Sequence, residues 1–385
     1  MQVQTIAGVT GSRADFGIQK PVYEAILAAP EFALDLYVTG MHLSPRFGNT
    51  VEEVESAGFA VAGRIDCDAT GGSHAEIALS TSAAMAGFTR AWERKRPDLV
   101  LLLGDRFETF AAAAAAYLLN IPIAHIAGGD VTSGSLDDGL RHAISKFSHL
   151  HFTTNDEASA RLIRMGEDPA MVLTTGSPAL DSIQSLNLLS RDEVAERVGV
   201  PLGAHLLVVT FHPATADKGA PVEQFEELLA ALEALPDDHV SLITYANADT
   251  GGEALNRVLE ETAARSSHIL ARKSLGQMLY LSVLRHASIV VGNSSSGLYE
   301  APSFGIPTVN IGSRQDGRLR AASVIDCPPE RHAIADAIAR AAMMDCAGTI
   351  NPYGDGRATD SIVERLLAAV PFSGLGMKRY FDPSE

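Results

Sequence analysis

Short apolar runs recur through the first half of the chain, and a longer stretch with helical spacing follows each of them. The runs show little alternation of apolar and polar residues, which is typical of strands that a parallel sheet buries on both faces. The predicted strands of this half are 4–11, 34–40, 98–105, 121–129, 150–155 and 171–176. This pattern predicts a doubly wound α/β lobe.

The same pattern starts again after about residue 178, with predicted strands at 206–213, 240–247, 288–295 and 306–312. We therefore predict an α/β protein with a first Rossmann-like domain over 1–177 and a second over 178–357. The remaining segment, 358–385, begins with a helical pattern. The sequence leaves open which lobe it packs on, and we expect the first. Ligands of open α/β sheets bind beyond the carboxyl ends of the strands, so two facing lobes predict a central cleft.

Composition narrows the function classes. A chain of 385 residues with 46% hydrophobic residues suits two domains. The net charge of −17 and the scattered lysines and arginines argue against nucleic-acid binding. No segment approaches the roughly 20 apolar residues of a membrane span, and the N-terminus reads as a buried strand rather than a signal peptide. Three cysteines without CxxC spacing predict a reducing cytoplasm, and we expect no metal site.

Polar residues follow the predicted strands of the first lobe at several places. The stretch GSRADFG (11–17) offers Arg13, whose guanidinium can bind an anion with two parallel hydrogen bonds. The stretch GDRFET (104–109) places Asp105 between a strand and a helix, where it is either a helix cap or a catalytic group.

The stretch HIAGGDVTSGSLDDGLRHAISK (125–146) is richer in acid than a loop requires. One of Asp137 and Asp138 can cap the helix that follows, but one cap leaves the other aspartates, including Asp130, unexplained. Crowded carboxylates have raised pKa values that suit general acid–base catalysis. We therefore expect these side chains to move protons.

The second lobe has a different kind of strand end. Serines and free backbone N–H groups open the helix predicted in GNSSSGLYEAPSFGIP (292–307) and form a seat for an anion, while Glu300 suits a neutral diol such as ribose. This combination indicates a nucleotide, although the serines also suit a plain helix cap. His212 and Asn247 end two other strands, and His212 is a phosphate partner, an acid–base group or a structural histidine.

Together these stretches resemble the UDP-N-acetylglucosamine 2-epimerases, and in particular their hydrolysing branch. The likeness runs in order over about 5–325, and its specific parts are the GGD…DD…RHAI.K and GNSS.G…E…G.P…N.G.RQ.GR patterns. It implies two Rossmann lobes of the glycosyltransferase-B type, UDP bound mainly by the second lobe, no cofactor and a homodimer. It also implies elimination of UDP from a UDP-2-acetamido sugar, followed by hydration of the resulting 2-acetamidoglycal.

The resemblance also assigns roles to residues of this chain. The catalytic candidates are Asp105, Asp130, Asp137 and His212. The substrate-binding candidates are Arg13, Arg106, His125, Asn247, Ser294, Ser295, Glu300 and Arg314.

The chain departs from the family at two places. Some members have a glutamate where this chain has Ala127, so the role of base passes here to Asp130 or Asp105. The family's lysine after the first-loop arginine is absent, since this region holds Gly17 and Ile18. UDP-GlcNAc, giving ManNAc and UDP, is the expected substrate, and UDP-N,N′-diacetylbacillosamine is the alternative. A non-hydrolysing epimerase, a glycosyltransferase and an inactive nucleotide-sugar sensor are the rival functions.

Overall fold

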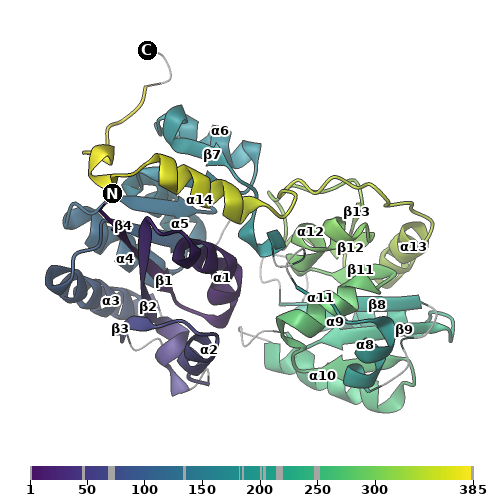
Figure 1. Ribbon diagram of the computed structural model, residues 1–385. Coiled ribbons are helices and arrows are strands. Elements are labelled where there is room, and N and C mark those ends of the chain that lie inside the picture. The colour runs from purple at the N-terminus through teal and green to yellow at the C-terminus, as the bar shows by residue number, and fades with distance from the viewer. Residues whose placement is uncertain are drawn as a thin grey trace. The chain divides into compact units, whose positions relative to one another are not determined.

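The computed structural model describes residues 2–45, 48–67, 74–132, 136–181, 183, 186–199, 202, 205–213, 220–246 and 252–382. The chain divides into two compact units (Figure 1). Unit 1 consists of Met1–Ser182 together with Tyr353–Glu385, and unit 2 is the continuous segment Ile183–Pro352. The sequence analysis placed the two changes of domain after residues 177 and 357.

Unit 1 is built on a parallel sheet with the strand order β3-β2-β1-β4-β5-β6-β7 over the described residues. This is the order of a Rossmann sheet with one strand added, and the connections reverse direction between β1 and β4. The strands are β1 (Gln4–Thr10), β2 (Phe32–Thr39), β3 (Val61–Ile65), β4 (Leu99–Leu103), β5 (Ile123–Ile126), β6 (Leu150–Thr153) and β7 (Val172–Thr174).

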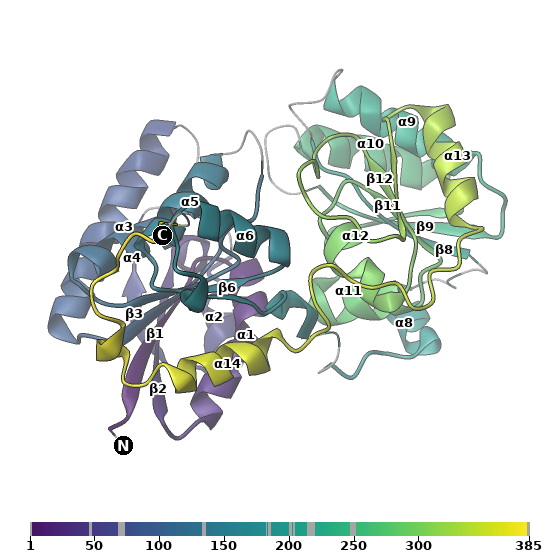
Figure 2. The ribbon, with the colours of Figure 1, turned by 90° about the horizontal axis from the view of Figure 1, so that it is seen from above.

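Helices cover both faces of this sheet (Figure 2). One face packs against α1, α2 and α14, and the opposite face against α3, α4 and α5. The alanines at 111–116 of α4 are buried, and their small side chains let α4 pack closely on the sheet and on α3. The helices of unit 1 are α1 (Arg13–Ala28), α2 (Val51–Ser56), α3 (His74–Arg94), α4 (Phe107–Leu118), α5 (Leu136–Phe147), α6 (Asp156–Arg164) and α14 (Ala358–Ala368), with 3-10 turns η1 (Gly40–Leu43), η3 (Pro169–Met171), η4 (Pro178–Leu180) and η6 (Phe372–Leu375).

Unit 2 repeats this architecture. Its parallel sheet has the order β10-β9-β8-β11-β12-β13 over the described residues, so β8 and β11 take the places of β1 and β4. The strands are β8 (His205–Thr210), β9 (His239–Thr244), β10 (Ile269–Arg272), β11 (Ile289–Gly292), β12 (Thr308–Ile311) and β13 (Val324–Cys327). The helices are α8 (Arg191–Val198), α9 (Pro221–Glu233), α10 (Gly252–Arg265), α11 (Gly276–Arg285), α12 (Ser296–Tyr299) and α13 (Arg331–Ala341), with the 3-10 turn η5 (Ala301–Phe304). The predicted fold class, α/β with two Rossmann-like parallel sheets, is confirmed.

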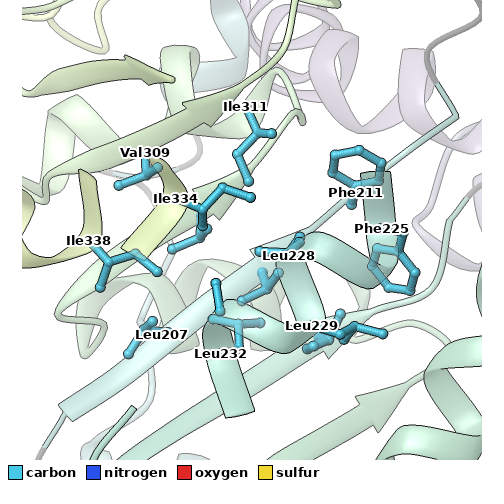
Figure 3. Packing of buried hydrophobic residues seen from close by; sticks show 14 of the residues in the cluster. Leu207, Phe211, Phe225, Leu228, Leu229, Leu232, Val309, Ile311, Ile334 and Ile338 are labelled. Atoms are coloured by element: carbon cyan, nitrogen blue, oxygen red, sulfur yellow. The ribbon is translucent and has the colours of Figure 1, made fainter. Parts of the chain in front are cut away.

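The core of unit 2 shows why its strands read as continuous apolar runs. On one face, Leu207 of β8 and Val309 of β12 pack against α9 and α13, with Leu228 and Ile334 among the contacting residues (Figure 3). On the other face, Val208 joins a second buried cluster with α8 and α11. Neighbouring residues of one strand are therefore buried on opposite faces.

The C-terminal segment belongs to unit 1. Helix α14 packs on α1 (Figure 1), and the tail beyond it reaches the end of α5. There the Lys378 ammonium donates hydrogen bonds to the carbonyls of Ser145 (2.8 Å) and Ser148 (2.5 Å), and it forms an ion pair of 2.5 Å with Glu167. The tail thus caps the negative end of α5. In the described part of the chain, no helix has the length and apolarity needed to cross a bilayer.

Candidate active site

The candidate site of unit 1 lies at the carboxyl ends of β1, β4, β5 and β6, which are neighbours in the sheet. Ser12 follows β1 and caps α1, because its hydroxyl accepts a hydrogen bond from the Asp15 N–H (3.2 Å) and also donates to the Asp15 carboxylate (2.8 Å). Arg13 is the first residue of α1, and its exposed side chain forms an ion pair with Glu53. The predicted anion-binding arginine therefore lies at this edge of the sheet.

Arg141 of α5 links the loops that follow β4 and β5. Its side chain is 5% exposed and pairs with the Asp105 carboxylate at the end of β4. The same guanidinium donates to the Asp130 carbonyl (2.7 Å) and to the hydroxyl of Thr132 (2.9 Å). Because a buried ion pair is costly to break, Arg141 fixes Asp105 and the backbone at Asp130 in one arrangement.

The Asp130 carboxylate is held from a third strand. The Thr154 hydroxyl, just beyond β6, donates to its two oxygens at 2.8 and 3.1 Å, and the Asn155 amide donates at 3.2 Å. Gly129 precedes it with φ +81°, and a Cβ there would lie 2.5 Å from the Ala158 carbonyl oxygen. This close approach to α6 requires glycine and sets the position of the aspartate that follows.

The two aspartates at the start of α5 differ in their environment. Asp138 accepts hydrogen bonds from the Thr132 N–H (2.7 Å) and from Arg141 (3.3 Å), so it holds the loop onto the helix. Asp137 is more exposed, yet the surrounding protein raises the pKa of its carboxyl, and the charge of Asp105 adds to the rise. A carboxyl with a raised pKa suits a proton donor, whereas Asp105 is engaged by a guanidinium.

Arg106 and Glu108 complete this edge. The Arg106 guanidinium bonds to Glu108 Oε1, from Nε at 3.0 Å and from Nη2 at 2.9 Å. Burial raises the pKa of Asp15, and the positive charge of Arg106 opposes that rise. Arg106 therefore balances the charges of Glu108 and Asp15, while Arg141 pairs with Asp105.

His125 lies inside the protein. It is fully buried in β5, its Nε2 is 2.7 Å from the Gly104 carbonyl, and its Nδ1 is 3.2 Å from the Ser145 hydroxyl. Burial lowers the pKa of His125 to about 3, so the ring is neutral and donates Nε2–H to Gly104. Both ring nitrogens are used by the protein, and we interpret His125 as a support for the loop that carries Asp105 rather than as a substrate ligand.

In unit 2, Asn293 joins the carboxyl ends of β8 and β11. Its amide accepts from the His212 N–H (2.7 Å) and donates to the His212 carbonyl (2.8 Å). The Asn293 carbonyl in turn accepts from Arg314 (3.0 Å) and Gln315 (2.7 Å) in the loop after β12. Three strand ends are thereby held together at the point where ligands of such sheets bind.

The serine-rich turn after β11 leads into the short helix α12, and the 3-10 turn η5 follows at Ala301. Helix α12 ends at Tyr299 after four residues, and Glu300 lies at its C-terminal end rather than near its start. Because so few peptide dipoles are aligned, the helix contributes little to anion binding. The seat for an anion predicted at Ser294 and Ser295 therefore depends on hydroxyls, single N–H groups and nearby cations such as Arg314.

Glu300 stands in a polar cluster with Ser296 and Tyr280 of α11. The Tyr280 hydroxyl donates to the Ser296 hydroxyl at 2.6 Å. Burial raises the pKa of Glu300, and the charge of Glu300 adds to the effect of burial in raising the pKa of Tyr280. The Glu300 Oε2 is buried without a hydrogen-bond partner among the described residues, which marks it as a group whose polar partner is missing.

The predicted residues thus fall into two groups within the units. Unit 1 brings together Arg13, Asp105, Arg106, Asp130 and Asp137 at one edge of its sheet, with His125 beneath it. Unit 2 brings together His212, Ser294, Ser295, Glu300 and Arg314. Asn247 lies outside the described residues. In the described part of the chain, no group of three or more histidine, cysteine, aspartate or glutamate side chains is arranged to hold a metal ion.

The sequence analysis left several residues of these edges unassigned. Arg141, Glu108 and Asn293 all lie within the motifs it quoted, and Thr154 and Asn155 end one of its predicted strands. The sequence does show the position of these residues, because each of them follows a predicted strand or lies on a helix that faces one. Their partners come from other strands, and spacing along the chain does not reveal such contacts.

Comparison with known proteins identifies the family of the chain. The sequence profile of the family described as UDP-N-acetylglucosamine 2-epimerase matches residues 24–367. The hydrolysing UDP-N,N′-diacetylbacillosamine 2-epimerase of Legionella pneumophila is 36% identical over 369 residues, which cover 96% of this chain and 97% of that protein. A polysialic acid biosynthesis protein of Escherichia coli is 37% identical over 334 residues, covering 86% of this chain and 84% of that protein.

The fold is also found in a solved structure. The crystal structure of UDP-GlcNAc 2-epimerase from Neisseria meningitidis, bound to UDP-GlcNAc, matches with a TM-score of 0.79 at 18% identity, covering 94% of this chain and all of that one. The family that the sequence motifs predicted is confirmed, and the chain belongs to the UDP-N-acetylglucosamine 2-epimerase family.

Proposed function

We propose that the protein is a hydrolysing 2-epimerase that acts on a UDP-2-acetamido sugar. A base removes the proton at C2, the C2–H electrons form the C1–C2 double bond, and the C1–O bond to UDP breaks with its electron pair on UDP. Water then adds to the 2-acetamidoglycal, with OH joining C1 and a proton joining C2 from the other face. The products are UDP and the free sugar inverted at C2.

The observation that carries this proposal is the set of acids at the strand ends of unit 1. Asp105 and Asp130 belong to two neighbouring loops that Arg141 holds, and Asp137 lies in the first turn of α5. In this proposal Asp105 and Asp130 are the candidates for the base at C2, and Asp137, whose pKa is raised, supplies a proton. The absence of a carboxylate at Ala127 leaves Asp130 as the acid of the β5 loop.

The strand ends of unit 2 are assigned to UDP. Hydroxyl and amide groups around Asn293, together with His212 and Arg314, suit a diphosphate, and the unpaired Glu300 oxygen suits ribose. Asn247 is kept as a further UDP contact. Arg13 and Arg106 of unit 1 are kept as substrate-binding candidates.

UDP-GlcNAc is the first substrate to test, with ManNAc and UDP as products. The Legionella relative, named for UDP-N,N′-diacetylbacillosamine, supports that sugar as the second candidate. The two differ at C4 and C6, so assays with both decide between them. The proposal includes a homodimer in the cytoplasm; the free thiols of Cys67, Cys327 and Cys346 fit a reducing compartment.

The test is incubation with UDP-GlcNAc in D2O, followed by NMR of the products. We expect UDP and free ManNAc that carries deuterium at C2. Formation of UDP-ManNAc would identify a non-hydrolysing epimerase, and turnover only with an added acceptor would identify a glycosyltransferase. Binding of both UDP-sugars without turnover would identify a sensor. Release of the free epimerised sugar from the diacetylbacillosamine substrate alone would transfer the proposal to that substrate.

A further inference from the structure

Glu108 is a buried acid to which neither the sequence motifs nor the proposed reaction assigns a role. It lies in the first turn of α4 and is 1% exposed. Its Oε1 accepts both hydrogen bonds from Arg106, while its Oε2 is buried without a hydrogen-bond partner among the described residues. A buried acid bonded through one oxygen is energetically costly, so its presence calls for an explanation.

The backbone around Glu108 is shaped to receive it. A Cβ at Gly40, where β2 ends, would lie 2.5 Å from Glu108 Oε1, and a Cβ at Gly11, where β1 ends, would lie 3.0 Å from it. Two other strand ends therefore leave room for this carboxyl beside the β4 loop. The ionisable groups that face it are Arg106 from its own loop, Asp15 from α1 and Cys67 after β3.

Glu108 can influence the reaction through Arg106. The positive charge of Arg106 lowers the pKa of Asp15 and of Asp137, against the effect of burial on each. An arginine side chain has many rotamers, and without a fixed partner the guanidinium would sample solvent. The two bonds to one Glu108 oxygen restrain the guanidinium where its charge acts on those acids.

We propose that Glu108 is a positioning residue that holds the Arg106 guanidinium against the catalytic acids of unit 1, and that loss of its negative charge releases Arg106. This inference rests on the proposed epimerase function. Glu108 itself touches neither the substrate nor the reacting atoms. It acts through Arg106.

The ion pair of Glu108 with Arg106 also predicts that activity depends on pH. Burial raises the pKa of Glu108, with the charge of Arg106 as the largest opposing effect. A carboxyl with a raised pKa becomes neutral at a higher pH than an exposed glutamate does. As the pH falls through that value, the ion pair with Arg106 is lost and activity declines on the acid side.

The test compares Glu108→Gln, Arg106→Gln and the double variant. We expect Glu108→Gln to lower kcat by about tenfold to a hundredfold, with a smaller change in KM and with the acid limb of the pH profile shifted to lower pH. The Tm of Glu108→Gln should not fall. Because burial raises the pKa of Glu108, ionisation of this carboxyl destabilises the folded protein above the pKa of an exposed glutamate, and the variant removes that cost. Glu108→Asp, which keeps the charge, should recover part of the lost kcat.

The double variant separates positioning from a plain structural role. If Glu108 acts through Arg106, the double variant should be no slower than Arg106→Gln. The inference is overturned if the kcat losses of the two single variants multiply in the double variant. An unchanged acid limb in Glu108→Gln, or a kcat loss explained by a lower Tm, would also overturn it.

A second readout does not depend on turnover. In the wild type, the Arg106 Nε–H should give a protected NMR signal that disappears on acidification, identified by its absence from Arg106→Lys. The signal should be missing from Glu108→Gln at every pH. If wild-type protein shows this signal but turns over no UDP-sugar, the proposed function fails while the positioning of Arg106 stands. A protected signal in Glu108→Gln contradicts the positioning whatever the enzyme does.

Discussion

The two units have the same strand order around their central strands but opposite chemistry where those strands end. In unit 1 the ends of β1, β4 and β5 carry aspartates tied by the guanidiniums of Arg106 and Arg141. Among the described residues of unit 2, the ends of β8 and β11 carry the Asn293 amide, serine hydroxyls and the acid Glu300. The shared topology determines where a ligand binds, and the loops determine what the edge does with it.

The two edges also differ in how they are held. Arg141 is a charged link buried among acids, so its removal leaves carboxylates without a counterion. Asn293 is a neutral link whose amide and carbonyl groups are all used. A charged link suits a place where protons move, and a neutral link suits a place that has to accept an anionic ligand. Five substitutions, taken in four predictions, probe the two edges.

The largest effect is expected for the aspartates of unit 1. Asp105→Asn and Asp130→Asn should each lower kcat by about a hundredfold to ten-thousandfold, as loss of a general base does, while the Kd for UDP stays close to wild type. Turnover and UDP calorimetry measure the two quantities, and Asp237→Asn on the surface of unit 2 is the control. Near-normal turnover in Asp130→Asn would remove that residue from the catalytic set.

The second-largest effect is expected for Arg141, the charged link of unit 1. Arg141→Met should lower stability by about 3 kcal/mol, because it leaves the half-buried carboxylates of Asp105 and Asp138 without their buried counterion, and it should also abolish turnover. Urea unfolding measures the free energy. Arg161→Met, which removes an arginine of neighbouring α6 that bonds to the Gly129 carbonyl, is the comparison. Equal losses of stability in both variants would show that the ion pair of Arg141 with Asp105 contributes no more to the free energy of unfolding than the contact of Arg161 does.

A smaller effect is expected in unit 2, on binding rather than on turnover. His212→Ala should weaken UDP by about tenfold, which is the loss of one hydrogen bond to a charged group. The fall in kcat at saturating substrate should be much smaller than in the aspartate variants. His239→Ala, at the opposite end of the neighbouring strand β9, is the control. A large loss of kcat with unchanged UDP affinity would move His212 to the catalytic group and weaken the contrast between the units.

The smallest effect concerns Ala127, which adopts φ +62°. A non-glycine residue in this left-handed region is strained, so Ala127→Gly should raise stability by up to about 1 kcal/mol without loss of activity. Ala342→Gly is the control, because that residue has φ −63° and gains nothing from glycine. A loss of stability in Ala127→Gly would show that the methyl group outweighs the strain.

Much of the fold was readable because central strands are buried on both faces. The central strands of both sheets were predicted, while β3, β10 and β13 were not. These three are edge strands with many half-exposed residues, and their sequences, such as VAGRI at 61–65, lack a continuous apolar run. The edge strand β7 was found because its run ends in glycine.

The site was readable in part for a related reason. A strand end can be recognised locally, so Asp105, Asp130 and His212 could be chosen from the sequence. The length of α12 could not, because three serines suit a short turn as well as a longer helix. Contacts such as Glu108 with Gly40 join strand ends that are far apart in sequence, and local pattern does not reveal them.

The discontinuous composition of unit 1 has a consequence for synthesis on the ribosome. Unit 2 is one unbroken segment, so all of it has been translated before α14 and Lys378 are made. Unit 1 lacks the helix that packs on α1 and the ammonium that caps α5 until residues 353–382 have emerged. Domains fold as units during synthesis, so unit 2 completes its fold before unit 1 does. The acids at the start of α5 receive their last support only when translation of this segment ends.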